Sequence, residues 1–237
     1  DCPNIVWILG GDSPTQIQAH ADIVHAMAAG IRSGESSDCL ITFHPCGNQT
    51  SEQFHAAEWL DFNAMQSGHS HPNLADYRQI EILYRTTPVK PCMNMEPNYE
   101  QCPMFKARRQ QGDTPVIPLL SAYDVRKCLY RSILAGGAGF TYGCDPIRQV
   151  HREGDRIHVH DHWEDMPTWK EALKAPGSGQ LQFPVKELTK RSYFTRKPAQ
   201  ELLISGREES RVCYIKQRNE DPASHIRVAA CSKGSYI

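Results

Sequence analysis

The stretch NIVWILGGD, residues 4–12, decides the fold class of this chain. After Asn4 the run is continuously apolar up to Gly10, which is typical of a strand buried on both faces of a parallel sheet. An amphipathic stretch follows over residues 14–33, with Gly34 as its stop, and it predicts a helix. A buried strand followed by a helix is the unit from which parallel α/β sheets are built.

The same alternation of short apolar runs and longer amphipathic stretches continues along the chain. Four further strands are expected at residues 39–43, 59–65, 90–95 and 139–142. Helices are expected at residues 51–58, 74–85, 122–134 and 169–191, the last of them interrupted at residues 176–179. This alternation predicts the α/β class with a parallel sheet.

The pattern changes after about residue 196. Residues 209–217 and 225–231 alternate between apolar and polar in the manner of short strands, on either side of a turn at residues 219–222. We therefore expect two domains. Residues 1–195 form an α/β domain, and residues 196–237 form the start of a small β domain.

Composition restricts the classes of function. The 237 residues contain 26 Lys and Arg against 27 Asp and Glu, so the net charge of −1 provides no basic surface for nucleic acid. No apolar run approaches the roughly 20 residues that cross a bilayer, so membrane insertion is not expected. The nine cysteines include no CxxC pair, and most are predicted to be small core hydrophobes.

Polar residues follow each of the five expected strands. The loops at the carboxyl ends of parallel strands form the active face of α/β proteins. Polar groups at five such ends therefore predict one common site. In chain order these residues are Asp12, His44, Gln66, His69, Glu96 and Tyr142.

Asp12 and Glu96 are the candidate catalytic carboxylates. Glycoside hydrolysis requires one acid that protonates the leaving oxygen and one carboxylate that attacks the sugar or activates water. Each residue also has a structural alternative. Asp12 could cap a helix that starts near Pro14, and Glu96 could form a salt bridge with Arg78 or Arg126.

Two other acids and several neutral groups complete the candidate site. Glu100 is an alternative to Glu96, whereas Asp61 is expected to make an internal hydrogen bond. The expected partners of sugar hydroxyls are His44, Gln66, His69 and Asn94. The expected flat faces for sugar rings are Tyr99, Tyr142 and Trp163.

The stretch IHVHDHW, residues 157–163, favours a second hypothesis. In a zinc-dependent hydrolase the ligands would be His158, His160, Asp161 and His162. Their H-x-H-D-H spacing is one residue short of the H-x-H-x-D-H arrangement of dinuclear metallohydrolases. A third hypothesis is a noncatalytic carbohydrate-binding protein, in which the pocket persists without turnover.

Five motifs together resemble the apiosidase-like family of glycoside hydrolases. They are WILGGD at 7–12, LITFHPCG at 40–47, WLDFNAMQSGH at 59–69, KPCMNMEPNYE at 90–100 and AGFTYG at 138–143. Residues 169–180 are similar to the final helix of that family's (β/α)8 catalytic domain. The tail from about residue 196 resembles the β domain, labelled collagen-binding, that follows it.

The resemblance implies that this α/β chain is the C-terminal part of a TIM barrel, followed by the start of a small β-sandwich. The five expected strands would be strands 4 to 8, and strands 1 to 3 would lie outside this sequence. We therefore expect an incomplete reading frame, truncated at both ends. A closed barrel of eight strands within residues 1–195 would contradict this expectation.

The resemblance also implies an activity. Asp12 matches the acid/base of the family and Glu96 its nucleophile, in a retaining mechanism that needs no cofactor. The wider clan usually has Asn-Glu at the acid/base position, where this sequence has Gly11-Asp12. The implied substrate is a side chain of a plant or other complex polysaccharide, and the implied location is secreted or periplasmic.

Overall fold

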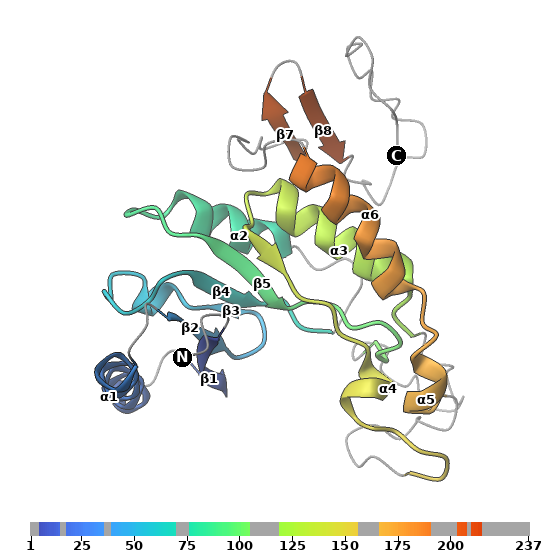
Figure 1. Ribbon diagram of the computed structural model, residues 1–237, viewed down its shortest axis with the longest axis horizontal. Helices are drawn as coiled ribbons and strands as arrows, with labels where there is room; N and C mark the ends of the chain where they lie inside the picture. Colours follow the sequence, from blue (N-terminus) through green and yellow to red (C-terminus); the bar gives the residue numbers. More distant parts are fainter. Residues whose placement is uncertain are drawn as a thin grey trace, which may run out of the picture.

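The described part of the chain has a mixed α/β fold in which parallel strands alternate with helices (Figure 1). The computed structural model describes residues 5–14, 18–35, 39–69, 76–104, 119–155, 166–190, 203–207 and 210–214. No described helix combines the length and the apolar character needed to cross a membrane.

The described strands of the first 195 residues form two sheets. The first is a parallel pair of β1 (Val6–Ser13) and β2 (Leu40–Pro45). The second has the order β3-β4-β5-β6, with β3 (Gln49–Thr50), β4 (Asn63–Gln66), β5 (Cys92–Glu96) and β6 (Gly139–Phe140). Strands β4, β5 and β6 are parallel, β3 runs antiparallel to β4, and β2 lies beside β4. A strand is therefore present in each of the five predicted places.

The helices match the prediction less uniformly. They are α1 (Gln18–Gly34), α2 (Asp76–Arg85), α3 (Ala122–Leu134), α4 (Asp145–Arg148), α5 (Trp169–Ala172) and α6 (Gly177–Lys190). The predicted helix at 51–58 is wrong, because only a 3-10 turn, η1 (Glu52–Phe54), is present. Ser51 ties the start of this segment to β4 through hydrogen bonds with Asn63 and the Ala64 amide, and this tie competes with a regular helix.

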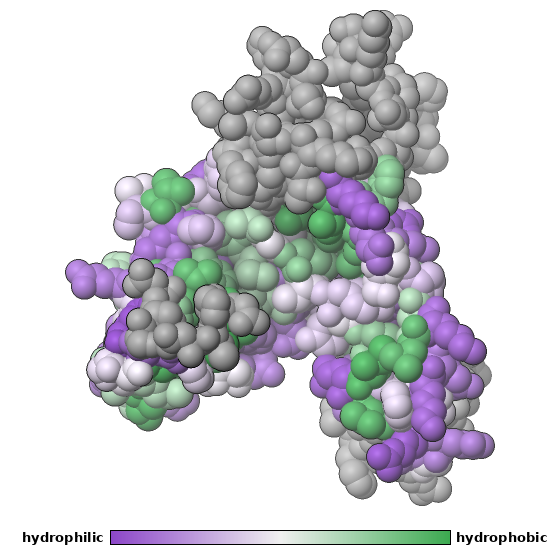
Figure 2. All heavy atoms as spheres, viewed as in Figure 1, coloured by the Kyte–Doolittle hydropathy of each residue, from purple (hydrophilic) through white to green (hydrophobic). Residues whose placement is uncertain are grey.

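The core lies between the sheets and the long helices. Helix α1 packs against the β1–β2 pair, α2 and α3 cover β4 and β5, and α6 packs on α3 (Figure 1). The short helices α4 and α5 form a separate lobe (Figure 1). Figure 2 shows apolar side chains exposed on this lobe, where they include Ile147, Val150 and Leu173.

The expectation that the first strand is buried on both faces is wrong. In β1 only Leu9 is buried, whereas Val6 and Ile8 are 42% and 49% exposed. The reason is that β1 pairs with β2 along one edge, and no described strand pairs with its other edge. The described strands accordingly do not close into a barrel.

The described tail is a hairpin of β7 (Leu203–Arg207) and β8 (Ser210–Tyr214), which contacts α3. Strand β8 overlaps the predicted strand at 209–217, but β7 was not predicted. The predicted strand at 225–231 lies outside the described residues. Of the six cysteines whose side chains the structure describes, five are buried and all six are free, as expected of core residues.

Asp76 begins α2 and is only 4% exposed. Its Oδ2 accepts a hydrogen bond of 2.8 Å from the Cys128 thiol. Burial raises the pKa of Asp76 to about 6, outweighing this hydrogen bond and the charge of Arg131. A carboxyl group whose pKa rises on folding stabilises the fold in its protonated form, and this contribution is lost as the pH rises through about 6.

We therefore expect Asp76→Asn to raise the free energy of unfolding at pH 8 by about 1–3 kcal/mol, because it removes a buried charge and keeps a carbonyl acceptor for Cys128. Near pH 4 the gain should be much smaller. Chemical denaturation at both pH values measures the difference, with the exposed Asp22→Asn as control. An equal effect at the two pH values would mean that ionisation of Asp76 does not cost stability.

Candidate active site

Glu96 ends β5 and is held by two histidines. Its Oε1 lies 2.9 Å from Nε2 of His69, and its Oε2 lies 3.2 Å from Nε2 of His44. The alternative partners suggested by the sequence, Arg78 and Arg126, instead lie over tyrosine rings. Glu96 is therefore fixed by imidazole groups at the carboxyl end of a strand.

The surroundings of Glu96 favour its ionised form. Burial alone would raise its pKa, but hydrogen bonds from His44, His69 and Gln66, together with the charge of His69, lower it far below its usual range. In return, the hydrogen bond to Glu96 raises the pKa of His44, although burial opposes this change. Glu96 is thus a carboxylate rather than a carboxylic acid in mildly acidic solution, which suits a nucleophile.

Two glycines bring Asp12 to the same place. Gly10 and Gly11 have positive φ angles of 93° and 71°, and Asp12 itself has a φ of 60°. A Cβ on Gly10 would lie 2.6 Å from the carbonyl oxygen of His44, so only glycine fits between β1 and β2 here. The register of the β1–β2 pair shifts between Gly10 and Ser13, which turns the Asp12 side chain away from the strand.

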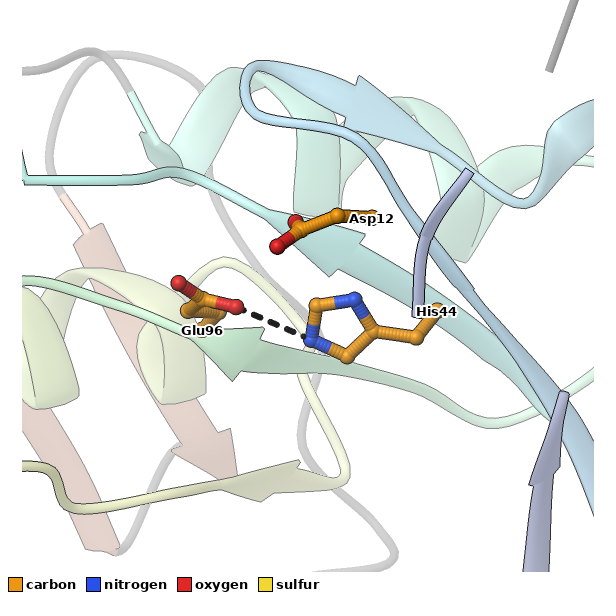
Figure 3. Close-up of side chains that lie close together, drawn as sticks. All are labelled: Asp12, His44 and Glu96. Atoms are coloured by element: carbon orange, nitrogen blue, oxygen red, sulfur yellow. Dashed lines mark ion pairs between the residues drawn. The ribbon is translucent and has the colours of Figure 1, made fainter. Parts of the chain in front are cut away.

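The carboxylate of Asp12 faces Glu96 and His44 (Figure 3). One ligand atom from each residue can be chosen so that all three lie within 4.8 Å of one another. Asp12 is exposed, while Glu96 and His44 are partly buried. Pro14 lies outside the described helix, which runs from Gln18, so the structure does not place Asp12 as the predicted cap. These groups could transfer protons to a substrate or act as ligands of a divalent metal ion.

Tyr99 supports the site from behind His69. The two ring centroids are 4.0 Å apart with planes at 33°. On another side Tyr99 lies against Gly143, where an added Cβ would stand 2.0 Å from the ring, and Arg148 lies 5.8 Å from the ring centroid. Tyr99 was predicted to stack on a sugar, and in this structure its ring packs against His69.

Two other predicted sugar-binding residues point to different partners. Asn94 is fully buried, and its Nδ2 donates to Ser67 Oγ at 2.9 Å, so the structure does not place it to bind a sugar hydroxyl. The Tyr142 hydroxyl donates to Glu100 Oε2 at 2.6 Å. Glu100 is itself 2% exposed and accepts from the Gly177 amide at the start of α6, which is a structural role.

Asp61 lies outside the cluster around Glu96 and has a structural role. Asp61 pairs with Arg32 at 2.6 Å and accepts from the Ile41 amide at 2.6 Å, which confirms the expected internal hydrogen bond. Trp163 lies outside the described residues, as do the proposed zinc ligands at 158–162.

One contact of the site was not predicted from the sequence. The Cys46 thiol donates to the backbone carbonyl of Asp12 and so links the loop after β2 to the end of β1. The only hint in the sequence was the position of Cys46, which directly follows the predicted strand end His44-Pro45.

The family profile of the apiosidase-like catalytic domain matches residues 1–195. This chain belongs to that family. The predicted resemblance is therefore confirmed over the α/β part of the apiosidase-like chain.

Solved structures agree with this assignment. A structure described as a glycoside hydrolase is 31% identical, with a TM-score of 0.70. A glycoside hydrolase family 5 structure from Bacteroides vulgatus ATCC 8482 is 32% identical, with a TM-score of 0.72. The matches cover 86% and 87% of this apiosidase-like chain and 46% of each structure, so the chain spans about half their length. Among curated proteins no significant match is found.

Proposed function

We propose that this chain carries the catalytic carboxylates of a retaining glycoside hydrolase. The observation that carries the proposal is the approach of Asp12 and Glu96, whose nearest carboxylate oxygens lie within 4.8 Å. Retaining enzymes place their two carboxyl groups about 5–5.5 Å apart, whereas inverting enzymes leave about 6.5–9.5 Å for a water molecule. The relatives named glycoside hydrolases add support.

In this mechanism Glu96 attacks the anomeric carbon and forms a glycosyl-enzyme, while Asp12 donates a proton to the departing oxygen. Asp12 then takes a proton from the water that attacks the same carbon and releases the sugar. His44 and His69 donate hydrogen bonds to Glu96, which keep it ionised and oriented. The exposed position of Asp12 suits its exchange of protons with a leaving group and with water.

The proposed fold of the whole domain follows from the relationship of the chain to the apiosidase-like family. Strands β1, β2, β4, β5 and β6 would be strands 4 to 8 of a (β/α)8 barrel, in a catalytic domain over residues 1–195 followed by a β domain over 196–237. The parallel pairing of β1 with β2, and of β4, β5 and β6, supports this proposal. The proposed substrates are side chains of plant or other complex polysaccharides.

The decisive experiment is the stereochemistry of hydrolysis. We expect proton NMR of the reaction of the chain with 4-nitrophenyl glycosides of neutral pentoses and hexoses to show, as the first product, the anomer with the configuration of the substrate. Initial formation of the opposite anomer would exclude Glu96 as a nucleophile. Failure to hydrolyse any glycoside would contradict the proposed function of the chain.

A metal-dependent hydrolase is the second candidate, because Asp12, His44 and Glu96 can also present three ligand atoms to one ion. The same reaction should be run after treatment with EDTA. Two-carboxylate hydrolysis should be unchanged, whereas activity that is lost and then restored by Zn²⁺ would show that the reaction depends on a metal ion.

A further inference from the structure

One concave surface lies outside the proposed catalytic residues. It is a cleft of about 450 Å³, and we call it the carboxamide cleft. The turn after β2, strand β3, the turn η1 and one residue of α2 form its walls. The lining residues are Asn48, Gln49, Thr50, Glu52, Gln53 and Gln79.

The lining of the carboxamide cleft indicates the chemistry of its ligand. Four of its six side chains are carboxamides, each of which both donates and accepts hydrogen bonds, and a fifth is the hydroxyl of Thr50. Sugar hydroxyls also donate and accept hydrogen bonds, so the hydrogen-bonding groups of the lining match those of a sugar. The only charged group of the lining is Glu52, so no cation is present to attract a uronate or phosphate. The lining therefore favours a neutral, hydroxyl-rich ligand.

The carboxamide cleft is linked to the catalytic carboxylate through one residue. Gln49 lies opposite Gln66 in the β3–β4 pair, and the Asn48 amide donates to the Gln66 carbonyl at 2.8 Å. On the other side of β4, Gln66 is paired with Glu96 in the register of β4 and β5. Gln66 is thus the strand neighbour of both the proposed nucleophile and the wall of the cleft, so a single residue separates Glu96 from the cleft.

The wall of the cleft is held in shape without a ligand. Gln79 Nε2 donates to the Asn48 carbonyl at 2.9 Å, which ties α2 to the turn. Ser51 and Phe54, on either side of the exposed Gln53, are buried in the core. A preformed wall with an exposed carboxamide loses little conformational entropy when it binds a ligand.

We propose that the carboxamide cleft is a subsite for a neutral sugar unit of the same glycan whose glycosidic bond lies between Asp12 and Glu96. This inference rests on the proposed glycosidase function and extends it to the substrate. The preferred substrate is a neutral oligosaccharide of at least two units, rather than a single sugar on a small leaving group or a polyuronate.

The test is Gln53→Leu, which keeps the size of the side chain and removes its hydrogen bonds. Gln53 has no assigned catalytic role, so hydrolysis of a 4-nitrophenyl monoglycoside should be unchanged. For neutral arabino- and xylo-oligosaccharides we expect KM to rise about 5–10-fold, because the variant loses one to two hydrogen bonds to the sugar. Gln182→Leu on the exposed face of α6 is the matched control and should change neither substrate.

Equal KM values for the wild type and Gln53→Leu with the oligosaccharides would overturn the subsite, as would an equal rise with the monoglycoside. Calorimetric titration of the chain with the same oligosaccharides, and with oligogalacturonides, measures binding without turnover. Weaker binding of the neutral oligosaccharides by Gln53→Leu would support the subsite even if no glycoside were hydrolysed. In that case the absence of hydrolysis would reject the proposed glycosidase function but not the subsite. Absence of binding, or a preference for the oligogalacturonides, would reject the subsite.

Discussion

Glu96→Gln should lower kcat/KM of glycoside hydrolysis by a factor of about 10³ or more, because an amide cannot form the glycosyl-enzyme. The substitution conserves shape, so the side chain can still accept a hydrogen bond from one of the two histidines. Substrate binding should therefore change much less than kcat. Steady-state kinetics on an activated aryl glycoside measures both parameters.

A second readout does not depend on activity. Because Glu96 raises the pKa of His44, the pKa of that imidazole in the Gln variant should fall toward its usual value. NMR titration of the histidine ring protons measures this change. The exposed Glu58→Gln serves as the control and should alter neither activity nor the titration of His44.

Residual activity within tenfold of the wild type would reject Glu96 as the nucleophile. A variant that is inactive but leaves the His44 titration unchanged would instead contradict the geometry in which His44 contacts Glu96. The two measurements therefore separate an error in the assigned mechanism from an error in the arrangement of the site.

The sequence was most informative at the ends of strands. Glu96 and His44 could be located because each directly follows an apolar run, and parallel pairing brings such ends to one edge. The contact between these two side chains could not be predicted, because it depends on how the imidazole ring of His44 is oriented. His44 and His69 were expected to bind sugar hydroxyls, and the structure shows both holding Glu96.

Other differences arise from tertiary context. The apolar run of β1 has the composition of a doubly buried strand, but its burial depends on which strands lie beside it and not on its own residues. Residues 51–58 have a helical pattern, yet the hydrogen bonds of Ser51 to β4 are long-range and outweigh local propensity. Asn94 was expected to bind a sugar hydroxyl because it is a neutral polar group near a strand end, whereas alternation along β5 turns it into the core.

Asp12→Asn should have an effect that depends on the leaving group. For natural oligosaccharides, whose leaving oxygen needs a proton, kcat/KM should fall by about 10²–10⁴-fold. For a 4-nitrophenyl glycoside the first step needs little acid assistance, so the glycosyl-enzyme should accumulate and release 4-nitrophenol in a burst. Added azide, an anion that needs no general base, should then restore turnover and yield a glycosyl azide of retained configuration.

This pattern distinguishes proton transfer from metal binding at the cluster of Asp12, His44 and Glu96. If Asp12 were a metal ligand, its replacement would weaken the binding of the metal ion and reduce activity on both classes of leaving group by similar factors. Excess Zn²⁺, rather than azide, would then restore the activity. Stopped-flow measurement of the burst and mass spectrometry of the azide product decide between the two outcomes. The control Asp22→Asn lies on the exposed face of α1 and should hydrolyse both substrates at the wild-type rate. A leaving-group-dependent loss with azide rescue requires a general acid and base at Asp12, since a metal ligand has no step in which azide could replace it.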